Sequence, residues 1–145
     1  TTMDLEGNAV DQSVLEDYTL TMVNVWATFC GPCLREMPDL GELAEEYKEN
    51  GVQFIGLVSD TMASDGSIDE NQVQTAKEVV ASTGANYIHL LPSNDLYGLL
   101  SQIYAVPTTF FVDKDGNQVG QTYVQSMTKE EWIKVIDEVL AEVNP

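Results

Sequence analysis

The chain of 145 residues contains two cysteines, Cys30 and Cys33, which are separated by Gly31 and Pro32. A bridge between residues this close constrains the unfolded chain little, so it would be a weak structural staple. The pair supplies only half of the four ligands of a structural zinc site, and the single histidine, His89, lies far along the sequence. The spacing therefore favours reversible thiol–disulfide chemistry, with no metal site, over a disulfide scaffold or a zinc ribbon.

Cys30 falls where a predicted central strand, residues 20–27, runs into a predicted helix. The first turn of a helix has unpaired N–H groups and positive partial charge, which together stabilise a thiolate. The spacing puts Cys33 about one turn further on, within reach of a mixed disulfide at Cys30. Pro32 fits this first turn, where its missing N–H costs little. We predict that Cys30 is the exposed nucleophile and Cys33 the buried resolving thiol.

The rest of the chain alternates between predicted strands and helices, whose limits follow from hydrophobic period and capping residues. The helix that begins at the cysteines carries one apolar stripe, and we expect a kink at Pro38 and an end at Gly51. Asp69 and Gln72 form a variant capping box for the next helix. The other predicted elements are a short hairpin around residues 5–10, strands at 52–58, 87–91, 108–112 and 118–124, and helices at 69–83 and 96–103.

The last helix has the clearest predicted start in the chain. Thr128 and Glu131 form a capping box, and Met127 and Trp132 occupy the two positions of a hydrophobic staple. The order of all these elements predicts an α/β fold in one domain that spans residues 1–145. We expect a central mixed β-sheet flanked by helices on both faces, with parallel strands first and an antiparallel hairpin last.

The charge balance restricts the partners of the chain. With 24 acidic and 6 basic residues, the formal net charge is −18. Such a surface repels phosphate backbones and anionic lipids, which argues against nucleic-acid binding and favours a basic or neutral protein partner. No segment has the 18 apolar residues of a membrane span. Because the chain opens at Thr1 without an initiator methionine, we expect that it was trimmed or that a targeting segment was removed.

Two segments resemble the signatures of the thioredoxin superfamily. Residues 23–33, with the sequence VNVWATFCGPC, are similar to its active-site segment, and residues 105–108, AVPT, to its cis-proline loop. The resemblance implies a thioredoxin-like fold in which a cis Pro107 shapes a loop beside Cys30. Backbone groups of that loop would pair with an extended substrate. The substrate-contacting set that follows is Phe29, Gly31, Pro32 and Val106, with Phe29 standing where thioredoxins usually have tryptophan.

Within the superfamily the chain resembles the TlpA/ResA-like branch. The resemblance rests on the N-terminal hairpin, an insertion between Ser59 and Asp95, the pattern of Glu36 and Pro38 after the cysteines, and the closing hairpin at residues 110–116. It implies a protein that is extracytoplasmic, either secreted or anchored to the membrane as a lipoprotein. It also implies protein disulfide substrates and an upstream membrane thiol-disulfide reductase. We expect a monomer that needs no cofactor.

One acidic residue near the cysteines has a predicted chemical role. Typical thioredoxins carry a buried aspartate where this chain has Asn24, which cannot move a proton, whereas the TlpA/ResA-like branch has an acid at the position of Glu36. Glu36 follows Cys33 by three residues and so lies beside the inward stripe of the helix. A partly buried carboxyl there would resist ionisation and relay a proton to or from Cys33. The alternative is that Glu36 is one more solvated acid.

Several other polar and aromatic residues are predicted to be structural. Trp26 is assigned to core packing, and His89 to a structural or surface position. Tyr97 and Tyr104 fit a helix face near Pro107 and are assigned no chemistry. An acidic cluster in the central loop does not match the calcium-binding pattern of EF hands, so we expect a solvated loop at Asp60, Asp65, Asp69 and Glu70.

The predicted function is that of a thiol-disulfide oxidoreductase that exchanges its dithiol with protein disulfides. Gly31–Pro32 is the dipeptide of strongly reducing thioredoxins, so the resemblance favours reduction. The alternatives are an oxidase that forms disulfides in secreted proteins and a non-catalytic Cu(I)-binding module, since soft thiolates suit Cu(I). No Met or His is spaced to complete a Cu(I) site. A peroxidase is disfavoured because the Pro/Thr-framed cysteine of peroxiredoxins is absent.

Overall fold

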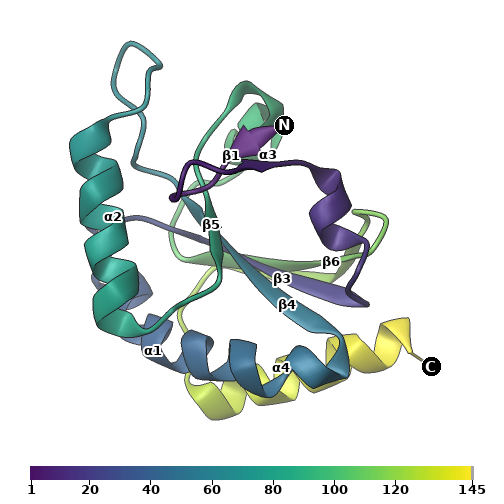
Figure 1. Cartoon of the computed structure of the whole chain (residues 1–145). Helices are drawn as coiled ribbons and strands as arrows, with labels where there is room; N and C mark the ends of the chain where they lie inside the picture. The colour runs from purple at the N-terminus through teal and green to yellow at the C-terminus, as the bar shows by residue number, and fades with distance from the viewer. Residues whose placement is uncertain (145) are drawn as a thin grey trace.

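The computed structural model describes residues 1–144. Its centre is a five-stranded sheet in the order β5-β4-β3-β6-β7, where β3 pairs in parallel with β4 and antiparallel with β6 (Figure 1). The predicted mixed α/β architecture, with parallel strands first and an antiparallel hairpin last, is confirmed. The bounds of the strands are Leu20–Trp26 for β3, Val52–Val58 for β4, Ile88–Leu90 for β5, Thr108–Asp113 for β6 and Gln118–Tyr123 for β7.

Helices cover both faces of the sheet unequally. Helices α1 (Gly31–Glu46) and α4 (Lys129–Val143) pack on one face, and α2 (Glu70–Thr83) lies beside α1 near the β5 edge (Figure 1). The opposite face carries only short elements, the 3-10 turns η1 (Gln12–Leu15) and η3 (Asn94–Leu96) and helix α3 (Tyr97–Leu100). Within residues 1–144, no helix has the length and the apolar character that crossing a membrane requires.

The alternation of side chains along β3 places the residues of interest. Met22, Asn24 and Trp26 point to the face under α1, where Met22 and Trp26 join two buried clusters. Val23 and Val25 belong to the cluster on the opposite face. Asn24 is therefore the polar member of a row that is otherwise apolar, and it lies beneath the helix that carries both cysteines.

The predicted N-cap residues of α2 and α4 form the expected side-chain hydrogen bonds, with one exception. Thr128 and Glu131 form both hydrogen bonds of a capping box at the start of α4. Asp69 caps α2 by accepting the N–H groups of Asn71 and Gln72. The side chain of Gln72, however, does not return to the cap. It donates instead to the Thr28 hydroxyl, in the segment that precedes Cys30, and to the Asp60 carboxylate.

Three predicted elements differ from the structure by more than one residue at an end. The N-terminal strands are β1 (Thr2–Met3) and β2 (Ala9–Val10), because residues 4–8 form the turn, in which the Asp4 carboxylate accepts two backbone N–H groups. Helix α1 continues through Pro38 and ends at Glu46, and the left-handed Gly51 closes a separate 3-10 turn, η2 (Lys48–Asn50). The helix expected at 96–103 has only one α-helical turn, in α3, after η3.

Candidate active site

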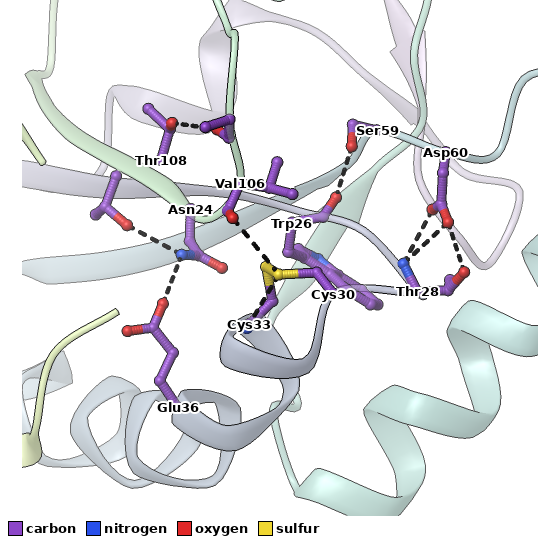
Figure 2. The surroundings of a disulfide bond; sticks show 12 residues. Asn24, Trp26, Thr28, Cys30, Cys33, Glu36, Ser59, Asp60, Val106 and Thr108 are labelled. Carbon is purple, nitrogen blue, oxygen red and sulfur yellow. Dashed lines mark hydrogen bonds between the residues drawn. A yellow bond between two sulfur atoms is a disulfide. The ribbon is translucent and has the colours of Figure 1, made fainter. Parts of the chain in front are cut away.

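The two cysteines form a disulfide at the N-terminus of α1, with their Cα atoms 5.3 Å apart (Figure 2). Cys30 is the N-cap residue of the helix, and its Sγ accepts the backbone N–H of Cys33 at 3.1 Å. Gly31 and Pro32 occupy the first helical positions and are exposed. An N–H that already points at Cys30 Sγ, together with the helix dipole, favours negative charge on that sulfur after reduction.

The burial of the two cysteines differs in the predicted direction but less than predicted. Cys33 has no exposed surface, as expected for a resolving thiol, whereas Cys30 keeps only 6% of its surface exposed in this oxidised state. The residues around Cys30 reach solvent more freely, since the side chain of Phe29 is 78% exposed. A substrate disulfide would therefore approach Cys30 from the side of Phe29.

The loop that faces the disulfide precedes β6. The Val106–Pro107 peptide bond is cis, and the Val106 carbonyl oxygen lies 3.6 Å from Cys30 Sγ. The hydroxyl of Thr108 donates to the Ala105 carbonyl at 2.6 Å, which closes the turn around Pro107. The structure thus brings Val106 and Pro107 together with the cysteines, although they lie far apart in the sequence.

An apolar groove of about 870 Å³ extends from this loop. Phe29 and Val106 line its end nearest Cys30. Four of the six large hydrophobic side chains that are exposed within residues 1–144 also line it, and none of its lining residues is charged. Besides Phe29, these four side chains include Met62, Tyr97 and Tyr104, which were not predicted to belong to the site. A contiguous exposed apolar surface beside a reactive centre is typical of a protein-binding site.

Glu36 is buried, so the prediction of a buried carboxyl is preferred over that of a solvated acid. Its Oε2 accepts the Met127 backbone N–H at 3.0 Å and the Trp132 Nε1–H at 3.1 Å, and its Oε1 accepts Asn24 Nδ2–H at 3.3 Å. Desolvation by burial raises the pKa of Glu36 above its ordinary value, although these three hydrogen bonds act in the opposite direction. In this oxidised structure the carboxylate of Glu36 is bonded to Asn24, Met127 and Trp132, and Cys33 is not among its hydrogen-bond partners.

Asn24 belongs to a buried row that crosses four strands. Pairing of β5, β4, β3 and β6 sets His89, Gly56, Asn24 and Thr109 side by side. The Nδ2 of Asn24 donates to Thr109 Oγ1 at 3.0 Å as well as to Glu36. A Cβ at Gly56 would overlap the ring of His89, so glycine is what lets this ring lie over the sheet. This row could not be predicted from the sequence, because it depends on the register of the strands.

His89 is structural and buried, and its ring connects Trp26 to the end of α2. Trp26 Nε1–H donates to His89 Nδ1 at 3.1 Å, and His89 Nε2 lies 2.8 Å from the Ala85 carbonyl. Burial lowers the pKa of His89 to about 4, so the ring is neutral near pH 7. A neutral ring with its proton on Nε2 satisfies both hydrogen bonds.

The segment just before Cys30 is held by a residue that was predicted to lie in a solvated loop. The carboxylate of Asp60 accepts the backbone N–H of Thr28 at 3.0 Å and also its hydroxyl (Figure 2). Gln72 Nε2 donates to the same carboxylate at 3.2 Å. Asp60 therefore holds the turn between β3 and α1 and, through Gln72, joins this turn to α2. Within residues 1–144, no group of three or more metal-binding side chains comes together.

Comparison with known proteins agrees with this geometry. The Redoxin family model matches residues 1–140. The thiol-disulfide oxidoreductase ResA of Bacillus thuringiensis strain Al Hakam is 34% identical over 128 residues, which cover 88% of this chain and 67% of the relative. ResA of B. thuringiensis subsp. konkukian is 32% identical over 144 residues, covering 98% of this chain and 73% of the relative.

Solved structures show the same fold at lower identity. A thioredoxin-family thiol:disulfide interchange protein from Chlorobium tepidum TLS superposes with a TM-score of 0.76 at 22% identity, covering 95% of this chain and 90% of the other. A secreted disulfide oxidoreductase of Mycobacterium tuberculosis superposes with a TM-score of 0.73 at 18% identity, covering 95% and 94%. The chain therefore belongs to the Redoxin family and, within the thioredoxin superfamily, is a TlpA/ResA-like thiol-disulfide oxidoreductase.

Proposed function

We propose that this chain reduces disulfides of protein substrates outside the cytoplasm, acting as a single-domain monomer. The observation that carries the proposal is the position of the Cys30–Cys33 pair. Cys30 Sγ lies at a helix N-terminus, receives an N–H from Cys33, and faces both the Val106 carbonyl and an uncharged groove. These features suit a sulfur that first attacks a substrate disulfide and then acts as the sulfur attacked by Cys33 in the mixed disulfide.

The reaction proceeds in two exchanges that conserve electrons. The Cys30 thiolate attacks one sulfur of the substrate disulfide, forms a mixed disulfide and releases the other substrate sulfur as a thiolate. The Cys33 thiolate then attacks Cys30 Sγ, forms the intramolecular disulfide and releases the second substrate thiolate. Two electrons pass from the Cys30–Cys33 dithiol to the substrate, and the product is the oxidised state that the structure shows.

Glu36 is the proposed proton acceptor and donor for Cys33. Its pKa is raised by burial, which brings the carboxyl closer to the pH at which thiols exchange protons. The Gly31–Pro32 dipeptide supports the reducing direction, and an upstream membrane thiol-disulfide reductase is the proposed electron donor. An oxidase of secreted proteins would instead run the two exchanges in reverse.

The proposed substrate contacts are Phe29, Gly31, Pro32 and Val106, with the groove as their continuation. An extended segment beside the substrate disulfide would place an apolar side chain in the groove, which has no charge of its own. The net charge of −18 favours a neutral or basic substrate protein.

The mechanism is tested by trapping the mixed disulfide. Cys33→Ser should accumulate a covalent complex with the substrate that dithiothreitol releases, because the resolving sulfur is absent, whereas Cys30→Ser should form no complex. If Cys33→Ser turns over at the wild-type rate, the two-step exchange is refuted. A reduction potential in the range of strong disulfide-forming oxidases would reverse the proposed direction.

The groove is tested by a matched pair of surface substitutions. Tyr104→Ser removes an aromatic side chain from the groove and should lower kcat/KM for a protein disulfide by about tenfold, corresponding to a loss of about 1.4 kcal/mol. Met3→Ser removes an exposed hydrophobic side chain outside the groove and should leave kcat/KM unchanged. Equal effects of the two substitutions would contradict the assignment.

A further inference from the structure

The side chain of Asn24 has one end that is fully bonded and one end that is not. Its Nδ2 donates to Glu36 Oε1 and to Thr109 Oγ1. Its Oδ1 is buried without any hydrogen-bond partner, and the residue is only 1% exposed. A buried acceptor without a donor is uncommon, because the group has lost its bonds to water and gained none in return.

The unpartnered oxygen is on the side of the amide opposite to Glu36. In Figure 2 the amide nitrogen of Asn24 faces Glu36, while its oxygen is directed to the side on which Cys30 and Cys33 lie. A disulfide sulfur has no proton to donate, so Oδ1 stays unpaired in the oxidised protein. Reduction creates an S–H on Cys33, which is fully buried on the same face of the sheet. The missing donor thus arises from the redox reaction itself.

We propose that the Asn24 amide is a two-position link through which the charge on Glu36 controls the ionisation of Cys33. The proposal rests on the proposed function in one respect, namely that the Cys30–Cys33 pair is reduced in each cycle. Asn24 is a positioning residue in this scheme, because it orients hydrogen bonds and does not itself accept or lose a proton.

In the first position Glu36 is ionised. Its Oε1 accepts Asn24 Nδ2–H, so Oδ1 is the end that faces Cys33 and accepts the S–H of the reduced thiol. An acceptor at this place stabilises the neutral thiol and disfavours the thiolate. Cys33 therefore keeps its proton while Cys30 attacks the substrate.

In the second position Glu36 is protonated. Its Oε2 already accepts two N–H donors, from Met127 and Trp132, so the added proton belongs on Oε1, the oxygen that faces Asn24. A proton there favours reversal of the amide, so that Oδ1 accepts from Glu36 and Nδ2 turns to Cys33. The hydroxyl of Thr109 rotates from acceptor to donor, which its geometry allows. The N–H group then stabilises the Cys33 thiolate.

The net change is one proton lost by Cys33 and one gained by Glu36, with no electron transferred. The other titratable groups in and around the buried cluster of Cys33 are Cys30 on α1 and, from the neighbouring β5 segment, Tyr87 and His89. Burial raises the pKa of Tyr87 far above neutrality and lowers that of His89 to about 4, so both are uncharged near pH 7. Asp39, three residues further along α1, acts on Glu36 through its charge and also raises the pKa of Glu36. Glu36 is the titratable group that is hydrogen-bonded to Asn24.

A double-mutant cycle on Cys30→Ser protein tests the link, because Cys33 is then the only thiol. The thiolate fraction of Cys33 is followed by its ultraviolet absorbance as a function of pH. With Asn24 present, Glu36→Gln should increase the thiolate fraction at pH 7 by about tenfold, since the glutamine amide forces Asn24 into its second position. In the Asn24→Leu background, the same Glu36→Gln substitution should change that fraction by less than about threefold.

The control is Gln53→Leu, which removes a half-buried amide from the opposite face of the sheet and should leave the effect of Glu36→Gln intact. If Glu36→Gln acts equally with Asn24 and with Asn24→Leu, a direct Glu36–Cys33 interaction replaces the link and the proposal is wrong.

A second measurement needs no substitution at Asn24. In reduced, otherwise unmodified protein, NMR contacts of the Asn24 side-chain NH₂ should move from Glu36 to Cys33 as Glu36 is protonated. Identical contacts in both states would overturn the proposal. Neither measurement requires turnover, so the link can fail while thiol–disulfide exchange stands, and the trapping experiment can fail while the link stands.

Discussion

The carboxyl of Glu36 gives the sharpest prediction for stability, because truncation and neutralisation have different consequences there. Glu36→Ala removes the acceptor of two donors, Met127 N–H and Trp132 Nε1–H, which have no other partner among the described residues. Each unsatisfied donor costs about 1–3 kcal/mol. Loss of the costly buried carboxyl offsets part of this, so we expect a net destabilisation of about 3 kcal/mol.

Glu36→Gln keeps an acceptor for both donors and removes the charge. The glutamine carbonyl takes the place of Oε2, and its NH₂ faces Asn24, which can reverse its amide to accept. We expect the free energy of unfolding to stay within about 1 kcal/mol of wild type at pH 7. Urea unfolding of the oxidised protein, followed by circular dichroism, measures both variants. Equal destabilisation by Ala and Gln would refute the hydrogen-bond assignment.

The difference in free energy of unfolding between Glu36→Gln and wild type has a predicted pH dependence. The folded-state pKa of Glu36 is raised above the ordinary value of 4.5, so its contribution to stability is fully present below pH 4.5 and is lost as the pH rises through the raised pKa. Glu36→Gln lacks this loss. The free energy of unfolding of Glu36→Gln relative to wild type should therefore increase as the pH rises from 4.5. A constant difference across this range would contradict the raised pKa.

Three further predictions concern the groups around the site. Gly56→Ala should destabilise the protein by about 2–3 kcal/mol in urea unfolding because its Cβ overlaps the His89 ring, whereas Gly98→Ala, which meets open space, should be nearly neutral. The pKa of His89 is lowered from 6.5 to about 4, so the contribution of His89 to stability should fall by about 3 kcal/mol between pH 6.5 and 4. An NMR titration midpoint of the single histidine near 6.5 would disprove this. Asp60→Ala should cost about 1–2 kcal/mol and speed amide exchange at Thr28, and unchanged exchange would show that Asp60 does not hold the turn.

The features that could be predicted from the sequence are those set by residues close together in the chain. The junction of β3 with α1 follows from a run of apolar residues that ends at Cys30, and the start of α4 follows from Thr128 and Glu131. The prediction that α1 ends at Gly51 is wrong. It followed from an apolar stripe that reaches Tyr47 and from a glycine soon after it, at Gly51, which is a common helix-ending residue. That glycine closes a separate turn, η2.

The partners of Glu36 could not be predicted, because they depend on how distant elements pack. Three-residue spacing from Cys33 indicated that Glu36 lies near the inward face of α1. The residues that donate to its Oε2, Met127 and Trp132, are 91 and 96 residues away in the sequence. The staple formed by these two residues was predicted as a helix-start signal, and nothing in that pattern shows that their N–H groups point at α1.

A buried carboxyl at position 36 does not follow from the packing of α1 on the sheet. Its raised pKa means that the folded protein loses free energy by holding the charge there, and donors from β3 and the start of α4 offset only part of this loss. Apolar side chains at these positions would avoid the cost of the buried charge, but they would leave the Met127 N–H without its acceptor. The polar arrangement instead connects α4 to Asn24 on β3, beneath the helix that carries the cysteines. If the proposed Asn24 link operates, a change in the protonation of Glu36 acts in two places at once, on the docking of α4 and on the chemistry of Cys33.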